Sequence, residues 1–273
     1  MWTQLLAVAT TVVWCVSAQN STNVTVADVE QAFTTAKIVP DVLPSFDPVG
    51  LLNVVFLDNV TNTNISVTPG LNLTREQTAL RPTVSFTSNT TSFAQQTFIL
   101  AMVDPDAPTP QNPTVAQIRH LLAPNITLSG SLATGALLVN NSPAISDFQR
   151  PTPPAGSDPH RYILLLFAQP ANFSSVVTGI VNSSTPISNF NISAFAEQLG
   201  LGSPLAGNFF LTGPDANSTG NGTASSAASS STSTSPAGSS GGASNPPSSA
   251  VGMAELSWVG VTLSMGFLGM LLL

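Results

Sequence analysis

The apolar residues of this chain occur in short runs, and this spacing limits the fold more than any other feature. Residues 51–57 and 161–167 are mainly apolar, residues 97–103 form a nearly continuous apolar run, and residues 83–87 alternate between polar and apolar side chains. Runs of about 4–8 residues fit strands, whereas helices usually need about 10–12. The run at 97–103 is typical of a strand buried on both faces. The sequence therefore predicts several short strands.

Helical patterns are few. Residues 26–37 form one candidate, with Asp28 and Glu30 in the first turn. Residues 192–199 form the other, with Asn191 or Ser193 as the N-cap and Gly200 as the stop signal. We therefore expect a mainly β fold with a few peripheral helices.

The first eighteen residues are typical of a secretory signal peptide. An apolar run from Leu5 to Val16 is followed by the small residues Ser17 and Ala18, although no Lys or Arg precedes the run. The alternative is an uncleaved membrane anchor, but the run is shorter than the ~18–20 apolar residues that a span needs. We expect residues 1–18 to be removed.

The end of the chain fits a signal for a glycosylphosphatidylinositol (GPI) anchor. Residues 213–250 are rich in Ser, Thr, Ala, Gly and Pro, and residues 256–273 are uncharged and mainly apolar. Small residues, a polar spacer and an apolar tail are the pattern of such a signal, and Gly242 is the preferred attachment residue, with Gly241 and Ser240 as competitors. A retained tail-anchor helix is the alternative, but basic flanking residues are missing. The predicted organisation is a signal peptide at 1–18, a folded domain at 19–212, a glycosylated stalk at 213–242 and a removed propeptide at 243–273.

Charge and cysteine content exclude several functions. Six basic residues stand against thirteen acidic ones, for a net charge of −7, so the chain lacks the basic surface that nucleic-acid binding requires. Cys15 is the only cysteine and lies in the predicted signal peptide. The mature protein therefore has neither disulfides nor thiol chemistry.

N-glycosylation acceptors are dense in this chain. Behind a signal peptide, Asn-x-Ser/Thr sequences become sites of N-linked glycans on the surface. We expect several to be occupied among Asn20, Asn23, Asn59, Asn64, Asn72, Asn89, Asn125, Asn140, Asn172, Asn182, Asn191, Asn217 and Asn221.

Two polar clusters adjoin predicted strands. Residues 104–108 read Asp-Pro-Asp-Ala-Pro directly after the strand that ends at Val103, and His160-Arg161-Tyr162 opens another strand behind the loop Pro153-Pro154-Ala155-Gly156. His120 is the only other histidine. Prolines end the hydrogen-bonded ladder and fix both carboxylates at a strand end, where sites tend to lie.

These motifs resemble the signature of the phosphatidylethanolamine-binding protein family, also called Raf kinase inhibitor proteins. Further similar segments occur in the family's order over most of Val29 to Phe210. They are residues 38–43 (IVPDVL), 73–78 (LTREQT), 81–83 (RPT) and 201–210 (LGSPLAGNFF).

The resemblance implies a large antiparallel sheet packed on a smaller one, and a pocket that takes phosphate-like and carboxylate anions. Histidines can donate hydrogen bonds to an anion, and the aspartates can hold the imidazole rings in one tautomer. Arg161 is expected to brace the pocket by a bidentate pair with Asp104 or Asp106. The expected ligand-binding residues are Asp104, Asp106, His120, Pro154, His160 and Arg161.

Three positions depart from the family pattern. Val115 and Ile118 stand where aromatic residues are common, and Arg119 stands where a second histidine is frequent. We expect a more aliphatic pocket wall with a guanidinium at its rim, which weakens the case for phospholipid head-group binding.

The pattern does not favour an enzyme. No Gly-x-Ser-x-Gly sequence presents a nucleophile, the histidine spacing does not fit a metal site, and no cofactor is expected. We predict a GPI-anchored binding protein at the extracellular face of the plasma membrane or in the cell wall, with a small anion or a phospholipid head group as ligand. The alternatives are an inhibitor of a protease or another protein partner, and a structural or adhesive surface glycoprotein.

Overall fold

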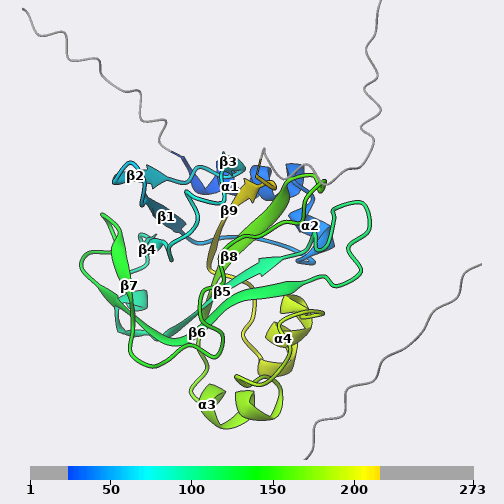
Figure 1. Cartoon of the computed structure of the whole chain (residues 1–273). Helices are drawn as coiled ribbons and strands as arrows, with labels where there is room; N and C mark the ends of the chain where they lie inside the picture. The colour runs from blue at the N-terminus through cyan, green and yellow to red at the C-terminus, as the bar shows by residue number, and fades with distance from the viewer. Residues whose placement is uncertain (1–23, 216–273) are drawn as a thin grey trace, which may run out of the picture. The chain divides into compact units, whose positions relative to one another are not determined.

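The computed structural model describes residues 24–215, which form a β-rich domain with helices at its periphery (Figure 1). The predicted signal peptide, the attachment residue Gly242, the apolar tail and nearly all of the stalk lie outside the described residues. So do the acceptors Asn20, Asn23, Asn217 and Asn221. In the described range, no helix has the length and apolar character needed to cross a membrane.

A nine-stranded sheet forms the body of the domain, in the order β2-β1-β4-β7-β6-β5-β8-β9-β3. Neighbouring strands are antiparallel except β3 and β9, which are parallel. All strands belong to one curled, hydrogen-bonded sheet and not to two separate sheets. They are β1 Leu51–Asp58, β2 Thr63–Ser66, β3 Leu71–Leu73, β4 Thr83–Thr87, β5 Phe98–Asp104, β6 Ile118–Ser129, β7 Ala136–Asn140, β8 His160–Ala168 and β9 Ala206–Thr212.

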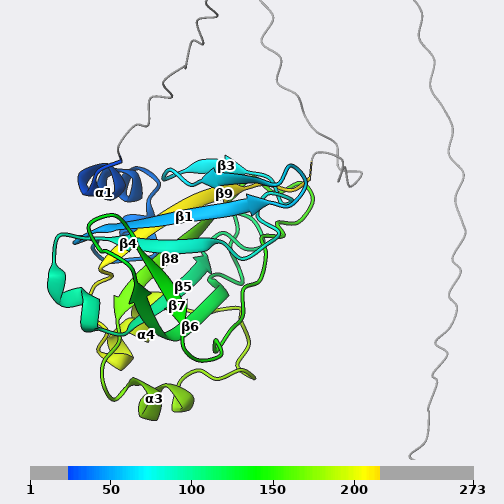
Figure 2. The ribbon, with the colours of Figure 1, turned by 90° about the vertical axis from the view of Figure 1, so that its left-hand side faces the viewer.

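The helices are short and lie outside the sheet. Figure 2 shows α1 at one end of the domain and α3 and α4 at the other. Their bounds are α1 Val26–Thr35, α2 Ile38–Asp41, α3 Phe173–Val176 and α4 Ile192–Leu199, with 3-10 turns at Thr91–Gln95 and Val177–Gly179. The predicted mainly β class with peripheral helices is therefore confirmed.

The core lies on both faces of β5 and β8, whose residues are buried almost throughout. Alternate side chains of a strand point to opposite faces. Ile99, Val103 and Leu165 therefore join the cluster under α1 and α4, whereas Leu100 and Leu164 face the cluster enclosed by the other strands. Burial on both faces fixes the ends of β5 and β8, where the polar motifs stand.

The predicted elements agree with the structure at most positions. The strands expected at 51–57, 83–87, 97–103 and 161–167 correspond to β1, β4, β5 and β8, and the helix at 192–199 has the predicted bounds. Asn191 is its N-cap, since its side chain accepts a hydrogen bond from the amide of Ala194, and Gly200 ends it in the left-handed conformation.

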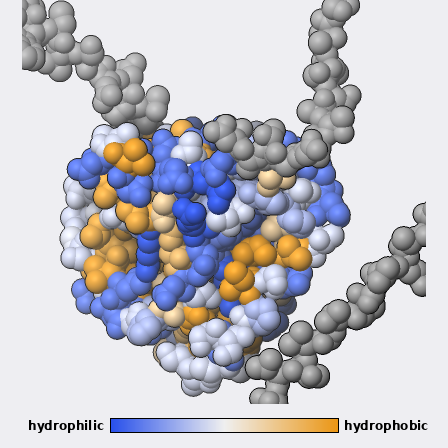
Figure 3. Space-filling model, viewed as in Figure 1, coloured by the Kyte–Doolittle hydropathy of each residue, from blue (hydrophilic) through white to orange (hydrophobic). Residues whose placement is uncertain are grey.

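Apolar side chains also occur at the surface. Figure 3 shows separate apolar patches among polar residues, including one over β7, where Leu137 and Val139 are exposed. Scattered exposed apolar residues are normal for a soluble domain.

Candidate functional site

A cavity of about 460 Å³ lies where β5 ends and β8 begins. Four of the predicted site residues line it: Asp104, His120, Pro154 and His160. Asp106 and Arg161 line a neighbouring cavity instead. The remaining lining residues of the first cavity are Ala107, Ile118, Gln149, Arg150, Thr152, Tyr162 and Ile187.

Asp104 and His160 form a buried pair at the base of this cavity. Asp104 is the last residue of β5 and His160 the first of β8, and the antiparallel pairing of the two strands brings them together. The Nδ1 atom of His160 lies 2.8 Å from Oδ2 of Asp104, and the two residues are only 1% and 2% exposed. The other carboxylate oxygen of Asp104 accepts the amide hydrogen of Asp106 at 2.8 Å.

The second ring nitrogen of His160 also faces acceptors. Its Nε2 lies 2.9 Å from the Ser157 hydroxyl and 3.2 Å from the Pro108 carbonyl oxygen. The Ser157 hydroxyl donates its own hydrogen to the carbonyl of Asp158 at 2.8 Å, so it accepts from the ring. Both nitrogens of His160 are satisfied when both carry hydrogen. Both ring nitrogens of His160 therefore have partners within the domain.

The carboxyl group of Asp104 stays ionised despite its burial. Burial raises its pKa, but the nearby imidazole of His120 and the hydrogen bonds from His160 and from the amide of Asp106 outweigh this effect. The pKa of Asp104 therefore lies below its usual value. His160 is its direct side-chain partner, at 2.8 Å.

His120 is aimed into the cavity by a β-bulge. In the pairing of β5 with β6, Met102 faces Leu121 but Val103 faces Arg119, so His120 is the extra residue of β6. Bulges re-aim side chains in this way. The Nδ1 atom of His120 lies 2.8 Å from the carbonyl oxygen of Gln149, which can only accept.

The Nε2 atom of His120 is therefore the ring nitrogen available to the cavity. It lies 3.9 Å from Oδ2 of Asp104, beyond hydrogen-bond distance. The ring also packs edge-on against Tyr162, with 5.1 Å between centroids. Burial and the charge of Asp104 raise the pKa of Tyr162 far above its usual value, so this phenol keeps its hydrogen.

Asp106 and Arg161 form a bidentate pair beside the cavity. Arg161 donates from Nε and Nη2 to the two carboxylate oxygens, at 2.9 and 2.7 Å, and its backbone amide donates at 2.8 Å. Its Nη1 donates to the carbonyl of Ala36 at 2.7 Å. Burial lowers the pKa of Arg161, but Asp106 and Asp41 raise it above its usual value. The pair fixes the 104–108 loop against β8 and the end of α1, and it does not reach the ligand cavity.

Two expectations about the pocket wall need correction. Arg119 does not lie at the rim of this cavity, because hydrogen bonds to Ser146 and Thr185 hold its side chain in the interior, where it is 1% exposed. Val115 does not line the cavity, whereas Ile118 does. The aliphatic wall is therefore made by Ile118 and Ile187.

Sequence reasoning missed Arg150, which lines the cavity and is exposed. Its position directly before Pro151, at the start of the proline-rich loop that carries Pro154, is the signal that could have identified it. With Asp104 and His160 paired, Arg150 and His120 are the groups in this cavity that can offer positive charge to a ligand.

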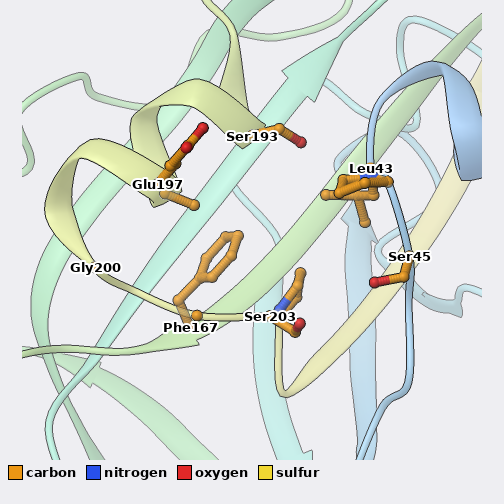
Figure 4. Close-up of a pocket in the computed structure, with 11 residues that line it drawn as sticks. Leu43, Ser45, Phe167, Ser193, Glu197, Gly200 and Ser203 are labelled. Carbon is orange, nitrogen blue, oxygen red and sulfur yellow. The ribbon is translucent and has the colours of Figure 1, made fainter.

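A second cavity, of about 370 Å³, lies between α4 and residues 43–45 (Figure 4). Glu197 and Ser193 stand on the helix side, Leu43 and Ser45 stand opposite, and the ring of Phe167 lies between them (Figure 4). In residues 24–215, no group of three or more His, Cys, Asp or Glu side chains is arranged to hold a metal ion.

Comparisons with known proteins agree with this architecture. The family model described as phosphatidylethanolamine-binding protein matches residues 63–210. A 26 kDa secreted antigen of Toxocara canis is 35% identical over 179 residues, which cover 65% of this chain and 62% of that protein. The match therefore spans less than two thirds of the length of that relative.

Two solved structures share the fold. A carboxypeptidase Y inhibitor, solved in complex with its cognate proteinase, aligns with a TM-score of 0.60 at 23% identity, over 72% of this chain and all of that one. A phosphatidylethanolamine-binding protein from Plasmodium vivax aligns with a TM-score of 0.55 at 18% identity, over 68% of this chain and 98% of that one.

Proposed function

Because this chain belongs to the phosphatidylethanolamine-binding protein family, we propose that it is an extracellular, GPI-anchored binding protein whose cavity at Asp104 and His120 takes a small anion. The observation that carries the proposal is the Nε2 atom of His120, which makes no hydrogen bond among the described residues and belongs to a cavity that Arg150 also lines. The family assignment makes it a binding protein, and the identity of the ligand rests on the chemistry of this cavity.

The charge balance of the cavity supports an anion. The carboxylate of Asp104 is paired with the imidazole of His160. The carboxylate of Asp106 is paired with the guanidinium of Arg161 outside the cavity. A protonated His120 then donates from Nε2, while its Nδ1 remains bound to Gln149. Arg150 adds a guanidinium suited to two oxygens of a phosphate or carboxylate group.

Replacing His120 by alanine is expected to weaken phosphate binding about tenfold or more, because a charged hydrogen bond contributes about 1.5–3 kcal/mol. Isothermal titration calorimetry with phosphate, acetate and phosphorylethanolamine measures the effect.

Arg81→Gln is the matched control, since it removes a positive charge outside the cavity. It should leave the affinity unchanged at moderate salt concentration. Equal phosphate affinity in the His120→Ala and wild-type proteins would contradict the proposed site. Preference for phosphorylethanolamine over phosphate would identify a lipid head group as the ligand.

The anchor is tested separately on cells. Phosphatidylinositol-specific phospholipase C should release the protein into the medium, and a Gly242→Leu variant should shift attachment or abolish it, since a small residue is required there. Retention on the cells after phospholipase treatment that releases other GPI-anchored proteins would refute the anchor and support a transmembrane tail.

A further inference from the structure

Arg119 is a buried cation without an acidic partner. Its side chain is 1% exposed, and none of the carboxylates in residues 24–215 lies within 4 Å of its guanidinium. Arg161, a less deeply buried arginine, is paired with Asp106 at 2.7 Å. Burial lowers the pKa of Arg119, and no neighbouring charge opposes that effect. An uncompensated buried charge is costly, which is why such groups are usually paired.

The contacts of Arg119 are all with neutral groups. Nε donates to the Ser146 hydroxyl at 2.6 Å, Nη2 to the carbonyl of Thr185 at 3.0 Å and Nη1 to the carbonyl of Pro186 at 3.5 Å. A guanidinium carries five hydrogens, so one on each terminal nitrogen is left over. Two such hydrogens match the two oxygens of one carboxylate.

A simpler role for Arg119 is to brace residues 185–187 against β6. The backbone already does this, because the amide of Arg119 donates to the carbonyl of Ile187 at 2.8 Å. Neutral donors could satisfy the carbonyls of Thr185 and Pro186 equally well. The bracing role therefore explains the hydrogen bonds but not the charge.

Arg119 lines a cavity of about 650 Å³ whose other walls are partly apolar and partly neutral polar. Ile180, Val181, Ala194 and Phe195 contribute aliphatic and aromatic surface, and the polar part includes Ser188, Asn189 and Gln198. The ring of Phe190 lies below the guanidinium, with 5.2 Å between its centroid and the central carbon. A ligand here would meet one cation, a set of apolar side chains and several neutral polar groups.

Helix α4 divides this cavity from the one in Figure 4, and the two differ in charge. Ser193, Ala196 and Glu197 face the cavity of Figure 4, where Glu197 supplies a carboxylate. Ala194 and Phe195 face the Arg119 cavity, which no acidic side chain lines. A carboxylate with an apolar chain should therefore be disfavoured in the cavity of Figure 4 and favoured in the Arg119 cavity.

We propose that the Arg119 cavity binds an apolar monocarboxylate, with the guanidinium holding the carboxylate and the walls at Val181, Phe190 and Phe195 taking the hydrocarbon part. This site uses neither His120 nor Asp104, so it does not depend on the anion site proposed above. A single guanidinium fork with apolar surroundings favours a singly charged, amphiphilic ligand over inorganic phosphate.

Calorimetry with sodium octanoate tests the site on the full-length mature protein after enzymatic deglycosylation, since the acceptor Asn191 also lines this cavity. One octanoate should bind per chain. Arg119→Gln should raise the dissociation constant at least tenfold, and octan-1-ol, with the same chain but no charge, should bind at least tenfold more weakly than octanoate. His120→Ala should leave octanoate binding unchanged.

Ala194→Phe provides a variant that leaves Arg119 intact. It fills the cavity from α4 at a partly exposed position, and it should also raise the dissociation constant at least tenfold. If Arg119→Gln fails to fold, this variant and the comparison with octan-1-ol decide whether octanoate binds in the Arg119 cavity. Absence of octanoate binding to the wild type, or equal affinity in the Ala194→Phe variant, would overturn the proposal.

Discussion

Replacing Asp106 by alanine is expected to destabilise the domain by about 3–5 kcal/mol. The carboxylate is 2% exposed and accepts three hydrogen bonds from Arg161, two from the guanidinium and one from the backbone amide. Its removal leaves Nε and Nη2 of a half-buried guanidinium without acceptors, and only Nη1 keeps its contacts with Ala36 and Asp41. Urea unfolding followed by circular dichroism measures the loss as a lower midpoint with an unchanged slope.

Two further variants separate the charge effect from a general effect of substitution. Asp47→Ala removes an exposed carboxylate that makes no hydrogen bond or ion pair among the described residues and should change stability by less than about 0.5 kcal/mol. The double variant Asp106→Ala/Arg161→Met should recover at least half of the loss, because neither charge is then left unpaired. A loss no larger than that of Asp47→Ala would show that the pair contributes little.

Strands β5 and β8 could be predicted because their side chains are buried along almost the whole strand. β5 and β8 are buried on both faces and read as continuous apolar runs. β6 was missed although it is the longest strand, because Arg119, His120, Pro124 and Asn125 interrupt the apolar pattern. These polar and proline residues thus hid the strand from a search for apolar runs.

The sequence predicted some of the residues that line the cavity, but none of the hydrogen bonds that hold its histidines. The motif order places Asp104, His120 and His160 near one another, and the structure brings them around one cavity. Which histidine keeps a free nitrogen depends on Gln149, Ser157 and Pro108, whose carbonyl and hydroxyl groups give no sequence signal. The direction taken by Arg119 depends likewise on carbonyls about 66 residues away in the chain.

Replacing Asp104 by asparagine is expected to lower stability at pH 7 by about 3 kcal/mol and to make stability less dependent on pH in the acid range. The folded-state pKa of Asp104 is lowered from its ordinary value of 3.8. A lowered pKa means that the unfolded chain binds the proton more readily than the folded one. The contribution of Asp104 is therefore fully present above about pH 4 and is lost as pH falls through the folded-state pKa.

The difference between wild type and Asp104→Asn should consequently be constant from pH 7 to about pH 5 and shrink below about pH 4. Urea unfolding at a series of pH values measures both curves, and Asp47→Asn serves as the control with a curve parallel to that of the wild type. A difference that stays constant down to pH 2 would mean that Asp104 is held by shape and not by charge. The buried pair of Asp104 and His160 would then not be ionic. The charge argument for anion binding at His120 would lose its support.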